Sequence, residues 1–131
     1  MNKKSKGTNA ERNLLHLFWN SGWACVRVAG SGSSRYPNPD LVASNKTRTL
    51  AIECKTSRGS KRYIKKEDID QIKLFSKLFS AEPWISIKFD RGDWFFILCE
   101  DLKKTNSGFL IDKEVIRTKG LLFEEVIKNQ I

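Results

Sequence analysis

Apolar residues recur at helical spacing near the start of the chain and predict a helix there. The positions are Leu14, Leu15, Phe18 and Trp19. Thr8 and Glu11 have the spacing of a capping box, so the helix is expected to begin at residue 8, and Gly22 is expected to end it. Residues 1–7 are then expected to form a basic, flexible tail. Glu11 lies in line with the apolar stripe, and local sequence alone also allows it merely to cap the helix. The distribution of charge along the chain favours a dual role, in which the carboxylate also turns inward toward the hairpin at residues 40–55.

Two apolar runs on either side of a polar turn at residues 45–48 predict a β-hairpin. Side chains alternate between the two faces of a strand, so Glu53 and Lys55 share one face of the second strand. Ile52 and Cys54 share the other face. Asp40 begins the first strand, and Glu53 nears the end of its partner. Strand pairing can therefore bring both carboxylates to one edge of the hairpin.

The remaining pattern mixes strands and helices. Strands are predicted at residues 23–29, 84–89 and 94–99, helices at residues 67–79 and 121–128, and a long loop at residues 30–39. This order of elements is typical of an α/β fold with a central mixed β-sheet flanked by helices. At 131 residues the chain is expected to form one domain, residues 1–131.

The net positive charge of the chain comes entirely from its first half, residues 1–62. Residues 1–62 hold twelve of the 24 Lys and Arg residues and three of the 15 Asp and Glu residues, whereas residues 63–131 hold twelve of each sign. The first half thus carries the whole net charge of +9, and its acids are Glu11, Asp40 and Glu53. A sequence pI near 9.6 favours nucleic acid as the partner. Neither a basic amphipathic helix nor an apolar run of ~20 residues points to a membrane.

Acids inside a polyanion-binding region require a cation between them and the phosphate. Two carboxylates and an ammonium, at Asp40, Glu53 and Lys55, are the parts of a magnesium-dependent phosphodiesterase site. Arg27 is the only charge inside its predicted strand. Its head lies in solvent at a sheet edge, or it is directed at substrate phosphate or at a site carboxylate.

The cysteines indicate a reducing compartment. Cys25, Cys54 and Cys99 each lie in an apolar, strand-like run. Their odd number, and the lack of Cys-x-x-Cys or His-rich spacing, disfavour a disulfide framework and a zinc site. Buried free thiols are expected instead, which fits the cytoplasm.

Five short segments follow one another along the chain. They are Asn9-Ala10-Glu11-Arg12, Val26-Arg27, Ala29-Gly30-Ser31, Pro39-Asp40 and Ile52-Glu53-Cys54-Lys55. In this order they resemble the archaeal Holliday-junction resolvases, a family of the restriction-endonuclease-like nuclease superfamily. The acid-x-Lys core is a weak motif by itself, and the five segments together are a much stronger one. The resemblance covers roughly residues 5–100 well and the remainder in outline.

The resemblance implies a restriction-endonuclease-like fold and a homodimer that binds four-way DNA junctions. It also implies paired nicks in two opposing strands with Mg²⁺, for which Mn²⁺ can substitute, and no small-molecule cofactor. The catalytic residues it implies are Glu11, Ser31, Asp40, Glu53 and Lys55, of which Glu11, Asp40 and Glu53 would be the metal ligands. The stretch before Asp40 varies in length within the family, so Ser33 and Ser34 remain alternatives to Ser31.

The basic residues are expected to contact DNA. From the resemblance and from the charge distribution, the DNA-binding residues are Lys3, Lys4, Lys6, Arg12, Arg27, Arg35, Arg58, Lys61 and Arg62. Among them, Arg12 and Arg27 match positions that the family uses near the scissile phosphate. Each phosphate contact is expected to make binding more sensitive to salt.

Two other functions remain open on the sequence. The chain could be a related nuclease that acts on flap, nicked or mismatched DNA, or a non-catalytic basic DNA-binding module with residual carboxylates. The dimer surface is open as well. Its candidates are the hairpin at residues 84–96 and the apolar side of the second helix, formed by Ile69, Ile72, Leu74, Phe75, Leu78 and Phe79.

Overall fold

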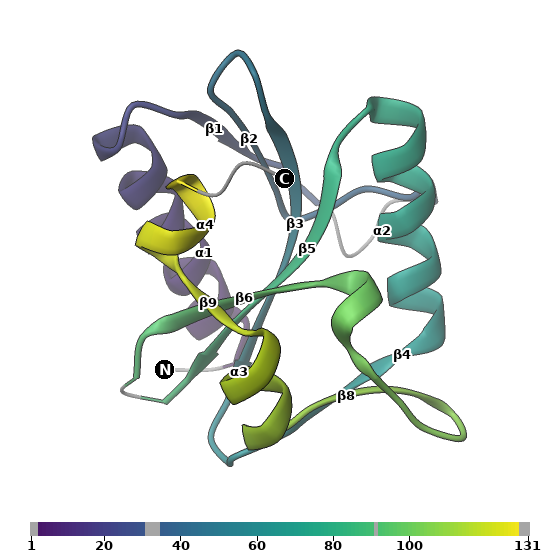
Figure 1. Cartoon of the computed structure of the whole chain (residues 1–131). Helices are drawn as coiled ribbons and strands as arrows, with labels where there is room; N and C mark the ends of the chain where they lie inside the picture. Colours follow the sequence, from purple (N-terminus) through teal and green to yellow (C-terminus); the bar gives the residue numbers. More distant parts are fainter. Residues whose placement is uncertain (1–2, 31–34, 91, 129–131) are drawn as a thin grey trace.

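A six-stranded mixed sheet organises the chain (Figure 1). The computed structural model describes residues 3–30, 35–90 and 92–128, and side chains from residue 9 onward. The strand order is β1-β2-β3-β5-β6-β9, in which β3 and β5 run parallel and the other neighbours are antiparallel. A second sheet has the order β4-β8-β7. The predicted central mixed sheet with flanking helices is confirmed.

Four α-helices, one 3-10 turn and nine strands make up the described part of the chain. They are α1 (Lys3–Asn20), β1 (Ala24–Arg27), β2 (Leu41–Ser44), β3 (Thr49–Ser57), β4 (Arg62–Lys65), α2 (Lys66–Phe79), β5 (Glu82–Phe89), β6 (Trp94–Leu98), the 3-10 turn η2 (Cys99–Asp101), β7 (Lys103–Lys104), β8 (Gly108–Ile111), α3 (Lys113–Lys119), β9 (Leu121–Leu122) and α4 (Phe123–Lys128). None of the helices in the described ranges is long and apolar enough to cross a membrane.

The sheet separates two apolar cores. Helices α1 and α4 cover one face, and α2 lies on the other (Figure 1). The first core joins Leu14 and Phe18 of α1 to Ile52 and Trp84 of the sheet. The second joins the other sheet face to α2, α3 and the small sheet, and its buried members are Ala51, Ile64, Ile69, Ile72, Ile85, Ile87, Ile97, Cys99, Leu102, Ile111 and Val115. Both faces of β3 are covered by apolar cores, so polar side chains on this strand are unusual and need an explanation.

The predicted hairpin is formed by β2 and β3. Leu41 pairs with Ile52 and Ser44 with Thr49 across a turn in which the Asn45 side chain accepts hydrogen bonds from the backbone N–H groups of Thr47 and Arg48. The second predicted hairpin, β5 and β6, is also confirmed. The three cysteines are free thiols, and Cys25 and Cys99 are buried, whereas Cys54 is half-buried.

The predicted start of the first helix is wrong. Helix α1 begins at Lys3, so residues 3–7 continue the helix and Thr8 lies inside it. A capping box is a local pattern, and each further helical residue adds one hydrogen bond, so an interior Gly7 costs only about 1 kcal/mol without ending the helix. The end of the helix is as expected, because Gly22 takes a φ of 84°, which glycine tolerates. Trp19 is about half exposed rather than fully packed.

The C-terminal third differs from the predicted pattern in two places. Helix α3 was not predicted, although Asp112 caps it by accepting a hydrogen bond from the Val115 N–H at 3.0 Å. The predicted helix over residues 121–128 begins two residues late, because Leu121 and Leu122 form β9 at the sheet edge. Both differences arise because these elements are short and their ends depend on tertiary pairing rather than on periodicity.

Candidate active site

Strand β3 carries Glu53 and Lys55 side by side on the face that α2 covers. The Lys55 ammonium lies 3.4 Å from a Glu53 carboxylate oxygen and 3.5 Å from an Asp68 carboxylate oxygen. Alternation along the strand puts both side chains on this face, as expected. Asp68, in the first turn of α2, therefore forms an ion pair with Lys55 across the space between the helix and the strand. This role of Asp68 was not predicted from the sequence, because acids in the first turn of a helix are also what the helix dipole favours.

Asp40 is fixed by the backbone on three sides. Its N–H donates to the Ile52 carbonyl at 3.0 Å, and its carbonyl accepts from the Val28 N–H at 2.9 Å. Its carboxylate accepts a hydrogen bond from the Cys54 N–H at 2.8 Å. Asp40 therefore links β1 to β3 just before β2 begins, and its carboxylate lies against the backbone between Glu53 and Lys55.

Glu11 reaches the site from helix α1. Its carboxylate accepts a hydrogen bond from Arg27 Nε at 2.9 Å, and only 18% of the Glu11 side chain is exposed. Of the alternatives that the sequence left open for Arg27, the structure therefore supports the one in which it holds a site carboxylate. The inward orientation expected for Glu11 is observed as well.

The three carboxylates influence one another electrostatically. The pKa of the Glu53 carboxyl is raised to about 7, chiefly by burial and also by the nearby Asp40, while Lys55 opposes the shift. Burial also raises the pKa of the Glu11 carboxyl, which the hydrogen bond from Arg27 lowers and Asp40 raises. Asp40 thus lies between two partly buried acids. The raised pKa values of Glu11 and Glu53 mean that ionising these two carboxyls is costly, and a cation nearby would relieve that cost.

The donor set fits a magnesium ion that keeps most of its own shell. Among the described residues, no three His, Cys, Asp or Glu side chains stand ready to hold a metal ion. Mg²⁺ needs no such cage, because it is commonly bound through one or two carboxylates, several waters and substrate phosphates. Asp40 and Glu53 supply two carboxylates, whereas Glu11 is held by Arg27. The geometry therefore fits a site completed by water and DNA.

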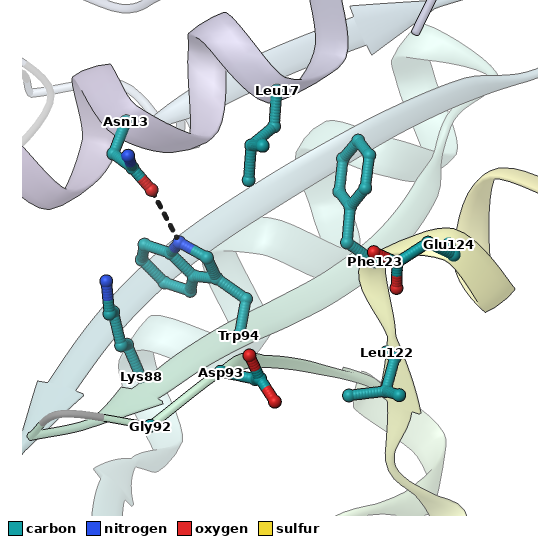
Figure 2. A pocket seen from close by; sticks show the side chains of 9 residues that line it. All are labelled: Asn13, Leu17, Lys88, Gly92, Asp93, Trp94, Leu122, Phe123 and Glu124. Atoms are coloured by element: carbon teal, nitrogen blue, oxygen red, sulfur yellow. Dashed lines mark hydrogen bonds between the residues drawn. The ribbon is translucent and has the colours of Figure 1, made fainter.

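Helix α1 is anchored so that Glu11 keeps its position. The Trp94 indole N–H donates to the Asn13 side-chain oxygen at 3.3 Å, which joins α1 to β6 (Figure 2). Leu14 and Phe18, on the next turns, are completely buried. A rigid support of this kind matters for a site whose groups come from four different elements.

The predicted DNA-contact residues differ in how freely they project. Arg12, Arg35, Arg58 and Lys61 are exposed, whereas Arg62 is half-buried and donates to the Thr56 carbonyl at 2.8 Å. The side chains of Lys3, Lys4 and Lys6, and all of residues 31–34 with the predicted catalytic Ser31, lie outside what the structure describes. The exposed arginines and Lys61 thus remain available for phosphate.

Comparisons with known proteins identify the family of the chain. The family model for "Archaeal holliday junction resolvase (hjc)" matches residues 2–131. The chain is similar to "Crossover junction endodeoxyribonuclease Hjc" of Archaeoglobus fulgidus, with 38% identity over 129 residues that cover 93% of this chain and 95% of the relative. It is also similar to the protein of the same name from Methanocaldococcus jannaschii, with 39% identity over 125 residues that cover 95% and 89%.

The chain is also similar in three dimensions to a solved structure of this family. The structure of Archaeoglobus fulgidus Hjc, described as a Holliday junction resolvase from an archaeal hyperthermophile, superposes with a TM-score of 0.87 at 38% identity. The match covers 92% of this chain and 98% of that one. The chain with the Asp40, Glu53 and Lys55 arrangement belongs to the archaeal Holliday junction resolvase family.

Proposed function

We propose that this protein is a crossover junction endodeoxyribonuclease, which binds four-way DNA junctions and cuts two opposing strands. The observation that carries the proposal is the contact between the Asp40 carboxylate and the backbone of β3 between Glu53 and Lys55. This contact supports the proposal because it brings the Asp40 carboxylate to the segment of β3 that carries Glu53 and Lys55, in a chain that belongs to this family. The exposed cations of the first half would hold the DNA backbone against that point.

We propose Asp40 and Glu53 as the ligands of a divalent cation, which would be Mg²⁺, with Mn²⁺ as a substitute. When bound, such an ion lowers the pKa of a coordinated water and neutralises charge on the phosphate. Asp40 is pre-oriented for this role because the Cys54 N–H fixes its carboxylate. Glu53 is a partly buried carboxyl with a raised pKa, so a nearby cation would favour its ionised form.

Lys55 would orient the attacking water or stabilise charge on the phosphate. Its ammonium stands between Glu53 and Asp68, so its position is set from two sides. Glu11 would act through Arg27, which it holds beside the site, or through a water that it shares with the metal. Ser31 remains a predicted contact to the scissile phosphate.

Two cuts in opposing strands require two sites, and we propose that a homodimer provides them. Three large apolar residues of α2 are exposed in the single chain: Leu74 by 47%, Leu78 by 78% and Phe79 by 54%. Phe79 also stacks on Phe75, on the same helix, at a centroid distance of 4.9 Å. The aromatics of the other candidate surface, Trp84, Trp94 and Phe96, are buried in the chain's own core. Helix α2 is therefore the better interface.

A nicking assay on three substrates tests the proposed function. Protein with Mg²⁺ is mixed with a four-way junction, a flap and a plain duplex of matched sequence. The proposal expects paired nicks in opposing strands of the junction and little cutting of the other two. Preference for the flap would favour the related nuclease, and binding without any cleavage would favour the non-catalytic module. Both results would contradict the proposal.

A further inference from the structure

An apolar groove lies beside the candidate active site, on the same face of the sheet. Its volume is about 390 Å³, within the range of about 300–1,000 Å³ usual for ligand pockets. Phe89, Phe95 and Ile116 form its apolar wall, and all three are only half-buried. Ser60, in the turn between β3 and β4, faces them from the other side. No element of the described chain fills this space.

The groove begins close to Lys55. In the parallel pairing of β3 with β5, Phe89 stands directly beside Ser57, which is two residues beyond Lys55 on the same face. Two residues of a strand span about 7 Å, which equals roughly two base steps of a stacked DNA strand. A strand whose phosphate reaches Lys55 can therefore place a neighbouring base at Phe89.

The rim of the groove is cationic. Lys113 and Arg117 lie one helical turn apart on α3, both exposed, and neither makes an ion pair with a residue that the structure describes. Glu114 between them is directed away, because its carboxylate lies 3.1 Å from Lys103. No acid occurs among the described residues that line the groove. Aromatic side chains beneath a cationic rim are typical of sites that bind nucleic-acid bases and their phosphates. The groove also continues into the basic turn at residues 58–62, so we favour a nucleic-acid base over an acidic peptide as its ligand.

We propose that this groove takes an unstacked base of the junction strand, with its aromatic wall against the base and Lys113 and Arg117 at the flanking phosphates. The inference rests on the proposed function and adds a subsite to it. Stacking of a base on an aromatic side chain tolerates any sequence, because every base has a π-face. The groove would therefore recognise an unstacked base at an opened branch point, whatever the base sequence there.

Photo-crosslinking tests the subsite directly. A four-way junction that carries 5-iodouracil at single positions next to the branch point is bound to the full-length protein in EDTA and irradiated. Mass spectrometry then locates the cross-link. The proposal expects attachment to Phe89 or Phe95 from one or two of these positions, and none from the same base in a plain duplex. If the protein binds the junction but the cross-links map only outside the groove, the proposed base subsite is wrong.

Variants separate the charge of the groove from its apolar wall. Lys113→Gln with Arg117→Gln is expected to weaken junction binding by about 5- to 10-fold and to reduce the salt slope by about 1 to 2. Ile116→Ala is expected to reduce the yield of the cross-link and to leave the salt slope of junction binding unchanged. The matched control, Lys104→Gln with Lys119→Gln, removes two exposed cations outside the groove and is expected to preserve the cross-link. Equal losses in the control and the groove variant contradict the proposal.

Failure of the proposed function is visible separately. A gel-shift titration before irradiation reports junction binding by itself. No binding of the junction at low salt would reject the function, and this inference with it. Normal junction binding and cleavage without a cross-link in the groove would reject the inference alone. A thermal melt of each variant confirms that the fold is retained.

Discussion

The Asp40 carboxylate accepts a hydrogen bond from the backbone N–H of Cys54 at 2.8 Å. Cys54 lies between Glu53 and Lys55, so this one contact ties the residue before β2 to the part of β3 that carries the other site groups. A backbone N–H group on a central strand therefore fixes one oxygen of the Asp40 carboxylate. An electrostatic site benefits from such preorganisation, because its groups need not rearrange during the reaction.

Binding of the junction is expected to be separable from cleavage. Asp40→Asn and Glu53→Gln each remove one negative charge and keep the size of the side chain. Both variants are predicted to bind the junction as tightly as the wild type or more tightly, because a carboxylate repels phosphate. Gel-shift titration in EDTA measures the affinity. A loss of binding in either variant would mean that these acids support the fold instead.

Glu53 makes the stability of the metal-free protein depend on pH. Its pKa is raised to about 7 in the folded state from 4.5, so between these values the folded state binds more protons than the unfolded state. The contribution of Glu53 to stability is therefore most favourable below about pH 4.5 and falls as the pH rises to about 7. Glu53→Gln is predicted to stabilise the protein at pH 8 by up to about 3 kcal/mol, and by little at pH 4.5.

Thermal or urea unfolding of both proteins at the two pH values measures that difference. Added Mg²⁺ provides the control, because a bound cation relieves the ionised Glu53 and narrows the gap at pH 8. A gap of the same size at both pH values would contradict the assigned cause.

The ion pair between Arg27 and Glu11 is predicted to contribute to the stability of the folded protein. Arg27→Ala leaves the Glu11 carboxylate largely buried without its partner and is predicted to cost roughly 1–2 kcal/mol. Glu11→Gln should recover part of this loss in the double variant, because a neutral amide is cheaper to bury. A double-mutant cycle by urea unfolding tests the coupling. Additive effects of the two substitutions would show that the ion pair contributes nothing.

The turn between β3 and β4 is predicted to contact phosphate. Lys61→Ala with Arg62→Ala should weaken junction binding and lower the log–log salt slope by up to about 2, since each phosphate contact contributes about 0.9. The metal dependence of cleavage should stay as it is. Because Arg62 also donates to the Thr56 carbonyl, Lys61→Ala alone is the control for local disruption. An unchanged slope in both variants would remove this turn from the DNA surface.

The exposed apolar side of α2 is predicted to form the dimer. Leu78→Glu places a charge at its most exposed large residue and should shift the protein to the monomer without lowering its melting temperature greatly. Sedimentation velocity at micromolar concentration measures the state. Tyr63→Glu, at another exposed large apolar residue outside α2, is the matched control. A wild-type protein that sediments only as a monomer would contradict the predicted dimer.

The local part of the site was predictable from the sequence. Alternation along β3 determined that Glu53 and Lys55 share a face, and the turn at residues 45–48 set the register that brings Asp40 close to them. The partner of Lys55 in α2 was not predictable. Asp68 is thirteen residues away, and its contact depends on how α2 packs over the sheet.

Periodicity also cannot separate an apolar core from an apolar interface. Ile69 and Leu78 belong to the same predicted side of α2, yet Ile69 is buried and Leu78 is 78% exposed. Both positions satisfy the same helical pattern. The choice among the three readings of Arg27 needed tertiary structure too, because Glu11 lies sixteen residues away on another element.

Single-turnover cleavage of a four-way junction, with Mg²⁺ and with EDTA, tests most directly whether Asp40 and Glu53 hold a metal ion. The account predicts that the wild type cuts only with Mg²⁺ and that Glu53→Gln, although it binds the junction, cuts at least about 10²–10³-fold more slowly. Cleavage by Glu53→Gln at the wild-type rate, or by the wild type in EDTA, would contradict it.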